Sequence, residues 1–177
     1  MKTSDAVHSL KQNFKDAKIV ESEFMGQIAI EVQKEDLKEI LSFLKRVPEP
    51  GYEVLMDLTG VDYVRPTKYT QVIYFLNNPT NYERVRVTVN AGRNDTLPSV
   101  VDIWEGANWY ERELFDLFGV HFAGHPDLKR ILMPDDWVGH PLLKDYALTE
   151  ESVEFKHGVK PKVPSQIIPY VGRSKKH

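Results

Sequence analysis

A strict alternation of apolar and polar residues over 83–90 constrains the fold of this chain more than any other feature. Val85, Val87 and Val89 are separated by polar or charged residues, and this period of two is typical of a β-strand with one buried face. The run ends in an Asn90-Ala-Gly92 turn, since Asn and Gly accept the backbone angles that turns require. We therefore expect a β-sheet that is covered on one side.

Three further segments complete the expected sheet. Residues 77–81 (Asn-Asn-Pro-Thr-Asn) have the composition of a turn, and they would join the 83–90 strand to a strand over 69–76 as a hairpin. Another strand is expected over 52–58. The segment 27–32 also alternates, with apolar residues at every second position, and predicts an additional strand.

Helices are expected on both sides of these strands in the sequence. The clearest lies over 34–46, where Pro48 follows the end of the apolar period. A short helix is expected over 5–14. Pro98-Ser99 is expected to open a further helical stretch, with Gly106-Ala107-Asn108 interrupting it before the next helix. The predicted fold class is α+β: a two-layer, mixed β-sheet with helices packed on one face.

Composition excludes several functional classes. The 177 residues contain no cysteine, so disulfides, cysteine nucleophiles, structural Cys–zinc sites and ordinary iron–sulfur ligation are excluded. The net charge of −3, with scattered basic residues, does not favour nucleic-acid binding. No apolar run approaches the ~20 residues that cross a bilayer.

The character of the chain changes after residue 133. Residues 134–177 are rich in proline and show no sustained period, yet they carry large apolar side chains. We expect a domain over 1–133, followed by an extended, irregular C-terminal arm over 134–177. The arm either wraps its own domain or lies on a partner subunit, and the second interpretation is preferred.

The segment 110–118 predicts an amphipathic helix with one misplaced charge. At about 100° per residue, Glu111 falls inside the apolar arc and must find a cation or hydrogen-bond donors. Arg130 is the leading candidate, with Lys129 or a partner chain as alternatives. Arg112 and Asp116 lie at i, i+4 on the opposite face, which predicts a surface ion pair.

Two catalytic interpretations stand beside these structural ones. Glu111 and Glu113 point about 200° apart on a helix, so they cannot flank one bond as a general acid/base pair. His121, His125 and His140 could form a metal site of a small metal-dependent hydrolase. However, the glycines and proline near His121 and His125 make a continuous helix through them improbable, and His125 is expected to hydrogen-bond within its own loop.

The residues from Trp104 to Tyr146 resemble the signature of the 30 kDa subunit of NADH–quinone oxidoreductase (respiratory complex I). The family pattern combines Glu-Arg-Glu, an acid, two hydrophobic residues, His or Lys, a basic residue and a hydrophobic pair at fixed spacings. The matching positions here are Glu111-Arg112-Glu113, Asp116, Leu117-Phe118, His125, Lys129 and Ile131-Leu132. The run from Leu132 to Tyr146 also looks like the family's C-terminal stretch, and the rest of the chain agrees in general layout.

The resemblance implies a structural subunit in the peripheral arm of a proton-translocating complex that passes electrons from NADH to quinone. The chain would carry no cofactor, because FMN and iron–sulfur clusters are expected in partner subunits. The expected partners are the large subunit of the quinone-reducing module and neighbouring cluster-bearing subunits, on the cytoplasmic side of the membrane or the matrix or stroma side of an organelle. Related alternatives are a subunit of a plastid or cyanobacterial complex, or of a membrane-bound hydrogenase.

Overall fold

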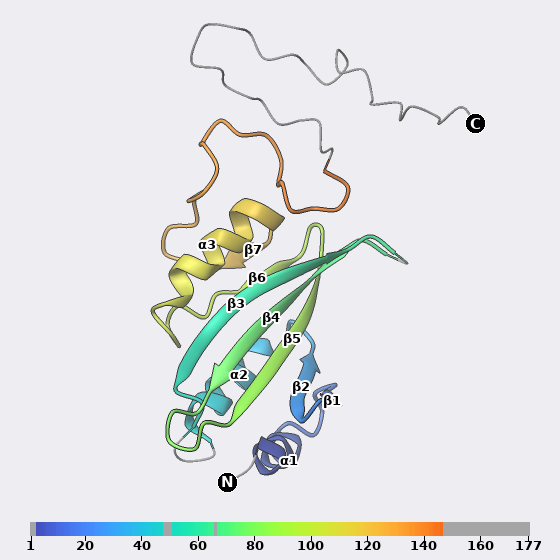
Figure 1. Cartoon of the computed structure of the whole chain (residues 1–177), viewed down its shortest axis with the longest axis vertical. Helices are drawn as coiled ribbons and strands as arrows, with labels where there is room; N and C mark the ends of the chain where they lie inside the picture. Colours follow the sequence, from blue (N-terminus) through green and yellow to red (C-terminus); the bar gives the residue numbers. More distant parts are fainter. Residues whose placement is uncertain (1–2, 48–50, 66, 147–177) are drawn as a thin grey trace, which may run out of the picture. The chain divides into compact units, whose positions relative to one another are not determined.

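The computed structural model describes residues 3–47, 51–65 and 67–146 of the chain. Its centre is a five-stranded sheet with the strand order β1-β2-β5-β4-β3 (Figure 1). In this sheet β2 and β5 run parallel, while the other neighbours are antiparallel. The mixed sheet and its helices confirm the α+β prediction. The strands of the sheet are β1 (Val20–Phe24), β2 (Gln27–Val32), β3 (Val54–Tyr63), β4 (Tyr69–Asn77) and β5 (Arg84–Gly92).

The helices α1 (Thr3–Asn13) and α2 (Leu37–Arg46) form where apolar residues recur at helical spacing. Figure 1 shows α2 behind the sheet. Together these helices and the inner face of the sheet enclose the core. The buried residues of α1 and α2 in that core are Ala6, Val7, Leu10, Leu37, Ile40, Leu41 and Leu44, and those of the inner sheet face include Ile30, Leu58, Val72, Tyr74, Leu76, Val85, Val87 and Val89.

The strand predicted over 52–58 lies later than expected, because β3 continues to Tyr63. Gly60 sits in the middle of this strand, where a Cβ would lie 2.9 Å from Leu114 Cδ2 of the last helix. The glycine therefore marks a close approach of helix and strand rather than the end of the strand. Tyr52 lies before the strand and is buried, and its N–H donates to the Leu44 carbonyl at the end of α2.

The helical stretch predicted from Pro98 is wrong. Pro98 ends a short strand, β6 (Thr96–Pro98), which pairs in parallel with β7 (His121–Ala123). The chain then makes tight turns, in which the N–H groups of Ile103 and Trp104 both donate to the Val100 carbonyl. Gly106 is the N-cap of α3 (Ala107–Phe118) rather than an interruption before it.

The described residues up to Lys144 form one compact unit, which ends before Asp145. This unit extends beyond the expected boundary at 133, because residues 134–144 belong to it. Most of the expected arm, residues 147–177, lies outside the described residues. In the described part of the chain, no helix has the length and apolar character that crossing a bilayer requires.

Candidate interaction site on the last helix

The helix α3 carries most of the residues that the sequence singled out. Leu114 is buried against the sheet, whereas Glu113 is exposed. The helix ends at Gly119, whose φ of +72° is a left-handed conformation that glycine adopts without strain. A Cβ at this position would lie 2.6 Å from the His140 ring, so the glycine also lets a distant segment lie directly against the end of the helix.

Glu111 is fully buried, as its place in the apolar arc predicted, but its expected partner is wrong. Its Oε1 accepts a hydrogen bond of 2.7 Å from the Val100 N–H, and its Oε2 is buried with no hydrogen-bond partner among the described residues. Burial raises the pKa of Glu111 to about 7, although hydrogen bonds from Val100 and Ser99 partly oppose this. The Tyr74 hydroxyl is also buried, with no hydrogen-bond partner in the described ranges. Its pKa is raised by burial and by the nearby Glu111.

Arg130 pairs with Asp116 instead. Arg130 Nη1 lies 2.6 Å from Asp116 Oδ1, and the carboxylate is fully buried. Asp116 Oδ2 accepts three backbone N–H groups, from Ile131 at 3.0 Å, Leu132 at 2.8 Å and Met133 at 2.9 Å. Burial by itself would raise the pKa of Asp116, but these four hydrogen-bond donors together hold it below its ordinary value.

The predicted surface pair between Arg112 and Asp116 is therefore wrong. A helical wheel assigns the face opposite the core to solvent, but residues 130–133 fold back over that face and bury Asp116. Arg112 instead donates to the carbonyls of Lys129 and Arg130, each at 3.2 Å. Its guanidinium also lies 5.0 Å from the centre of the Trp109 ring. Both arginines thus hold residues 129–133 against α3: Arg112 binds the carbonyls of this segment, and Arg130, which belongs to it, binds Asp116 of the helix.

Residues 130–144, here called the anchored segment, are held to one another and to the domain by several hydrogen bonds. Arg130 donates to the carbonyls of Trp137 and Gly139, each at 3.0 Å. The Leu142 N–H donates to the Leu117 carbonyl at 3.0 Å, and His140 Nδ1 donates to the Asp116 carbonyl at 2.9 Å.

The far end of the anchored segment is held by a second buried carboxylate. The Lys144 N–H donates to Asp62 Oδ2 at 2.7 Å, and Asp62 is also paired with Arg93. Asp62 was not among the residues predicted from the sequence, because the strand expected over 52–58 ended before it. Continuing the alternation from Leu58 to Tyr63 would have placed this acid on the inward face of the strand. Two buried aspartates, Asp62 and Asp116, thus fix the two ends of one segment.

Two further signature residues, Lys129 and His125, lie in the loop after α3. Lys129 pairs with Asp127 at 2.6 Å, and both side chains are largely exposed, so this ion pair contributes little to stability. His125 hydrogen-bonds within its loop, as expected. Its Nδ1 accepts the Asp127 N–H at 3.0 Å, which leaves Nε2 as the donor to the Asn108 carbonyl at 3.2 Å.

The three histidines do not form the metal site of the hydrolase alternative. The rings of His121 and His140 both contact Phe115, with centres 5.3 Å and 6.2 Å from its ring. His125 instead bonds to Asn108 at the opposite end of α3. Among residues 3–47, 51–65 and 67–146, no group of three or more His, Cys, Asp or Glu residues could hold a metal ion.

The fold and the site together define a class: an α+β domain whose last helix anchors the chain that follows it. Comparison with known families gives the particular assignment. The family described as "Respiratory-chain NADH dehydrogenase, 30 Kd subunit" matches residues 30–152, which include the sheet from Ile30 of β2 onward, α2, α3 and the whole anchored segment. The chain belongs to this family.

Curated relatives agree with this assignment, and each is named as a subunit of NADH-quinone oxidoreductase. The relative from Roseiflexus castenholzii is 44% identical over 79% of this chain and 81% of its own length. The relative from Geobacter sulfurreducens is 41% identical over 81% of this chain and 88% of its own length. A third, from Rhizobium meliloti, is 37% identical over 82% of this chain and 75% of its own length.

A solved structure shares the fold. A chain of the membrane-bound sulfane sulfur reductase, an archaeal respiratory membrane complex, superposes with a TM-score of 0.64. The match covers 76% of this chain and 78% of that chain at 20% identity. At this identity the match supports the fold alone.

Proposed function

We propose that this chain is a structural, cofactor-free subunit of the peripheral arm of a proton-translocating NADH:quinone oxidoreductase. It would help to assemble the quinone-reducing module together with the large subunit of that module. The observation that carries the proposal is the anchored segment, which two buried aspartates hold against α3 and the end of β3. The family assignment supplies the kind of complex in which such a subunit works.

The chemistry of the buried groups supports a structural role. Asp116 already accepts one guanidinium and three N–H groups, so it has little capacity left to bind a ligand or transfer a proton. Asp62 is similarly occupied by Arg93 and the Lys144 N–H. These carboxylates therefore use their hydrogen bonds to fix the chain, and Lys144 leaves the domain from a defined point.

Cofactors and location follow from the same proposal. A chain without cysteine cannot ligate an ordinary iron–sulfur cluster, so the clusters would lie in partner subunits. The resemblance to the family places FMN in a partner subunit as well. The chain would reach the membrane only through the complex, on its cytoplasmic side or on the equivalent side in an organelle. The names of the relatives favour NADH–quinone oxidoreductase over the plastid, cyanobacterial and hydrogenase alternatives.

Co-expression with the large subunit of the quinone-reducing module tests the assembly role. The full chain should co-purify with the large subunit at one to one, and a chain that ends after Tyr146 should fold but lose most of this binding. The matched control is Lys15→Gln, an exposed side chain outside α3 and the anchored segment, which should bind as the full chain does. Full binding by the shortened chain would contradict a role of the arm, and no binding by the full chain would contradict the assembly role.

Spectroscopy on the purified chain tests the cofactor-free role. The isolated chain should show no visible absorption and should not oxidise NADH. A stoichiometric chromophore, or turnover of NADH by this chain alone, would contradict the proposal.

A further inference from the structure

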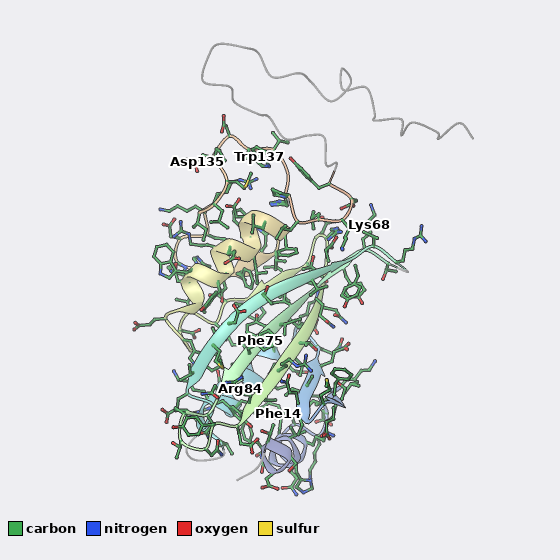
Figure 2. All side chains as sticks on the ribbon, viewed as in Figure 1. Phe14, Lys68, Phe75, Arg84, Asp135 and Trp137 are labelled. Carbon is green, nitrogen blue, oxygen red and sulfur yellow. The ribbon has the colours of Figure 1, made fainter. Side chains whose placement is uncertain are left out.

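The outer face of the sheet, opposite α1 and α2, contains a groove that the anchored segment does not use. The groove has a volume of about 290 Å³ and crosses β2, β5, β4 and β3 near one end of the sheet. Figure 2 labels two of its residues, Phe75 and Arg84, on the face of the sheet that is turned to the viewer. Its lining residues on this face include Gln27, Met56, Asp57, Phe75, Arg84 and Arg86.

Two arginines line this groove, and their side chains have no partner in the described part of the chain. Neither Arg84 nor Arg86 forms an ion pair or a side-chain hydrogen bond with any residue of the described ranges. The Nε of Arg86 is buried, and no described residue offers it a hydrogen-bond acceptor. A buried polar atom of this kind costs free energy unless an acceptor reaches it.

The one acid in the lining does not neutralise this charge. In the strand register, Asp57 faces Phe75 and Phe75 faces Arg86, so two strand spacings, about 10 Å, separate Asp57 from Arg86. Asp57 Oδ1 instead accepts the N–H of Leu58. The groove therefore presents two positive charges to which the sheet itself offers no acceptor.

Apolar side chains lie beside the arginines. Phe75 forms part of the lining, and Met56, next to the bulge in β3, is 43% exposed. Val54, on the same edge strand, is 41% exposed. An inorganic anion could satisfy the guanidinium groups but would leave these apolar atoms in water, whereas a peptide with acidic and apolar side chains covers both.

At the other end of the outer face, away from the groove, polar side chains are paired with one another. There Gln71 donates to Asn90, and Asn90 donates to Glu31, so the polar groups satisfy one another. Such a surface is normal for the solvent-exposed side of an antiparallel sheet. On this face, within the described residues, unpartnered arginines and exposed apolar side chains occur together at the groove end.

We propose that this groove binds a segment of another subunit of the complex in which one or two carboxylates flank an apolar side chain. The carboxylates would accept from Arg84 and Arg86, and the apolar side chain would cover Phe75 and Met56. The proposal rests on the proposed function, because it requires a multi-subunit complex, but it describes an interface separate from the C-terminal arm.

Photo-crosslinking within the assembled complex tests the proposal. The probe is p-benzoylphenylalanine at position 75, where it replaces an aromatic side chain of similar shape, and mass spectrometry identifies the crosslinked peptide. The expected product is a segment of another subunit with Asp or Glu close to the crosslink. The double variant Arg84→Glu/Arg86→Glu should lower the yield by about an order of magnitude, the factor that 1.4 kcal/mol of lost binding produces.

Matched variants separate charge from folding. Lys15→Glu/Lys18→Glu reverses two charges outside the groove and should leave the yield unchanged. If the reversed arginine variant does not fold, Arg84→Gln/Arg86→Gln removes the charges more gently and should still lower the yield, by a smaller factor.

Several results would overturn the proposal. The first is a crosslink to a segment without acidic residues, to this chain itself, to lipid or to nucleic acid. The second is the absence of any crosslink in a complex that assembles. The third is an unchanged crosslink yield in arginine variants that fold. Failure of the unlabelled chain to assemble with any other subunit would instead refute the proposed function, and this inference with it.

Discussion

Substitution of Asp116 by asparagine tests the central structural claim, that one buried carboxylate holds the anchored segment to α3. The change keeps the shape of the side chain but removes its charge, and an amide presents only one acceptor oxygen in place of two. Arg130, whose side chain is 15% exposed, would lose its counter-charge. The amide NH2 would face either Arg130, in place of Oδ1, or the three N–H groups, in place of Oδ2. Breaking a buried pair by changing one partner costs about 3–5 kcal/mol.

Thermal and urea denaturation of the purified chain measure this cost. For a domain of this size, 1 kcal/mol corresponds to about 2–4 °C, so Asp116→Asn should lower the Tm by roughly 6–20 °C. Glu113→Gln is the control, because Glu113 is exposed on the same helix, and its Tm should change by less than about 2 °C.

The pH dependence provides an independent check with a defined sign. The pKa of Asp116 is lower in the folded state than its ordinary value of 3.8, so its contribution is complete above that value and is lost as the pH falls through the folded pKa. Asp116→Asn should lack this acid-dependent loss. If the variant matches the wild-type Tm at pH 7, or both proteins lose stability equally on acidification, the anchoring role of Asp116 is wrong.

Three further predictions concern other parts of the chain. Glu111→Gln should remove a pH dependence of opposite sign, because the wild-type chain should lose at most about 3 kcal/mol of stability as the pH rises from 4.5 to about 7. The variant should therefore have a higher Tm than the wild type at pH 8. An equal or lower Tm there would contradict the burial of the carboxyl. A chain that ends after Met133 should have a Tm at least several degrees below that of a chain that ends after Tyr146, because it lacks the hydrogen bonds to Asp62 and Leu117. Equal melting curves would show that residues 134–144 contribute nothing to the stability of the domain. Gly119→Ala should lower the free energy of unfolding, measured in urea, by more than about 1 kcal/mol, because φ is +72° and the Cβ would meet His140. The control Gly106→Ala should not destabilise the chain, because φ is −61° and no described atom lies within 4 Å of the added Cβ. Similar effects of both changes would refute the assigned contact.

The sequence determined the elements whose apolar pattern repeats over several turns or pleats. The alternation around Val87 and the helical spacing around Leu41 each require one buried face, and both faces are buried as predicted. The position of Glu111 inside an apolar arc likewise predicted its burial, because a helix of known period leaves little freedom in where a side chain points. The resemblance carried by the signature residues was confirmed by the family assignment.

Tertiary structure alone decided the partners of the buried charges. Periodicity describes a helix facing one core, but α3 is covered on two sides, by the sheet and by the anchored segment. The second cover buries Asp116, assigns Arg130 to it and leaves Glu111 with the Val100 N–H. It also extends the compact unit to Lys144. Most bonds that hold residues 134–144 use a backbone N–H or C=O of that segment, and every residue type except proline carries both groups, so they carry no mark in the sequence.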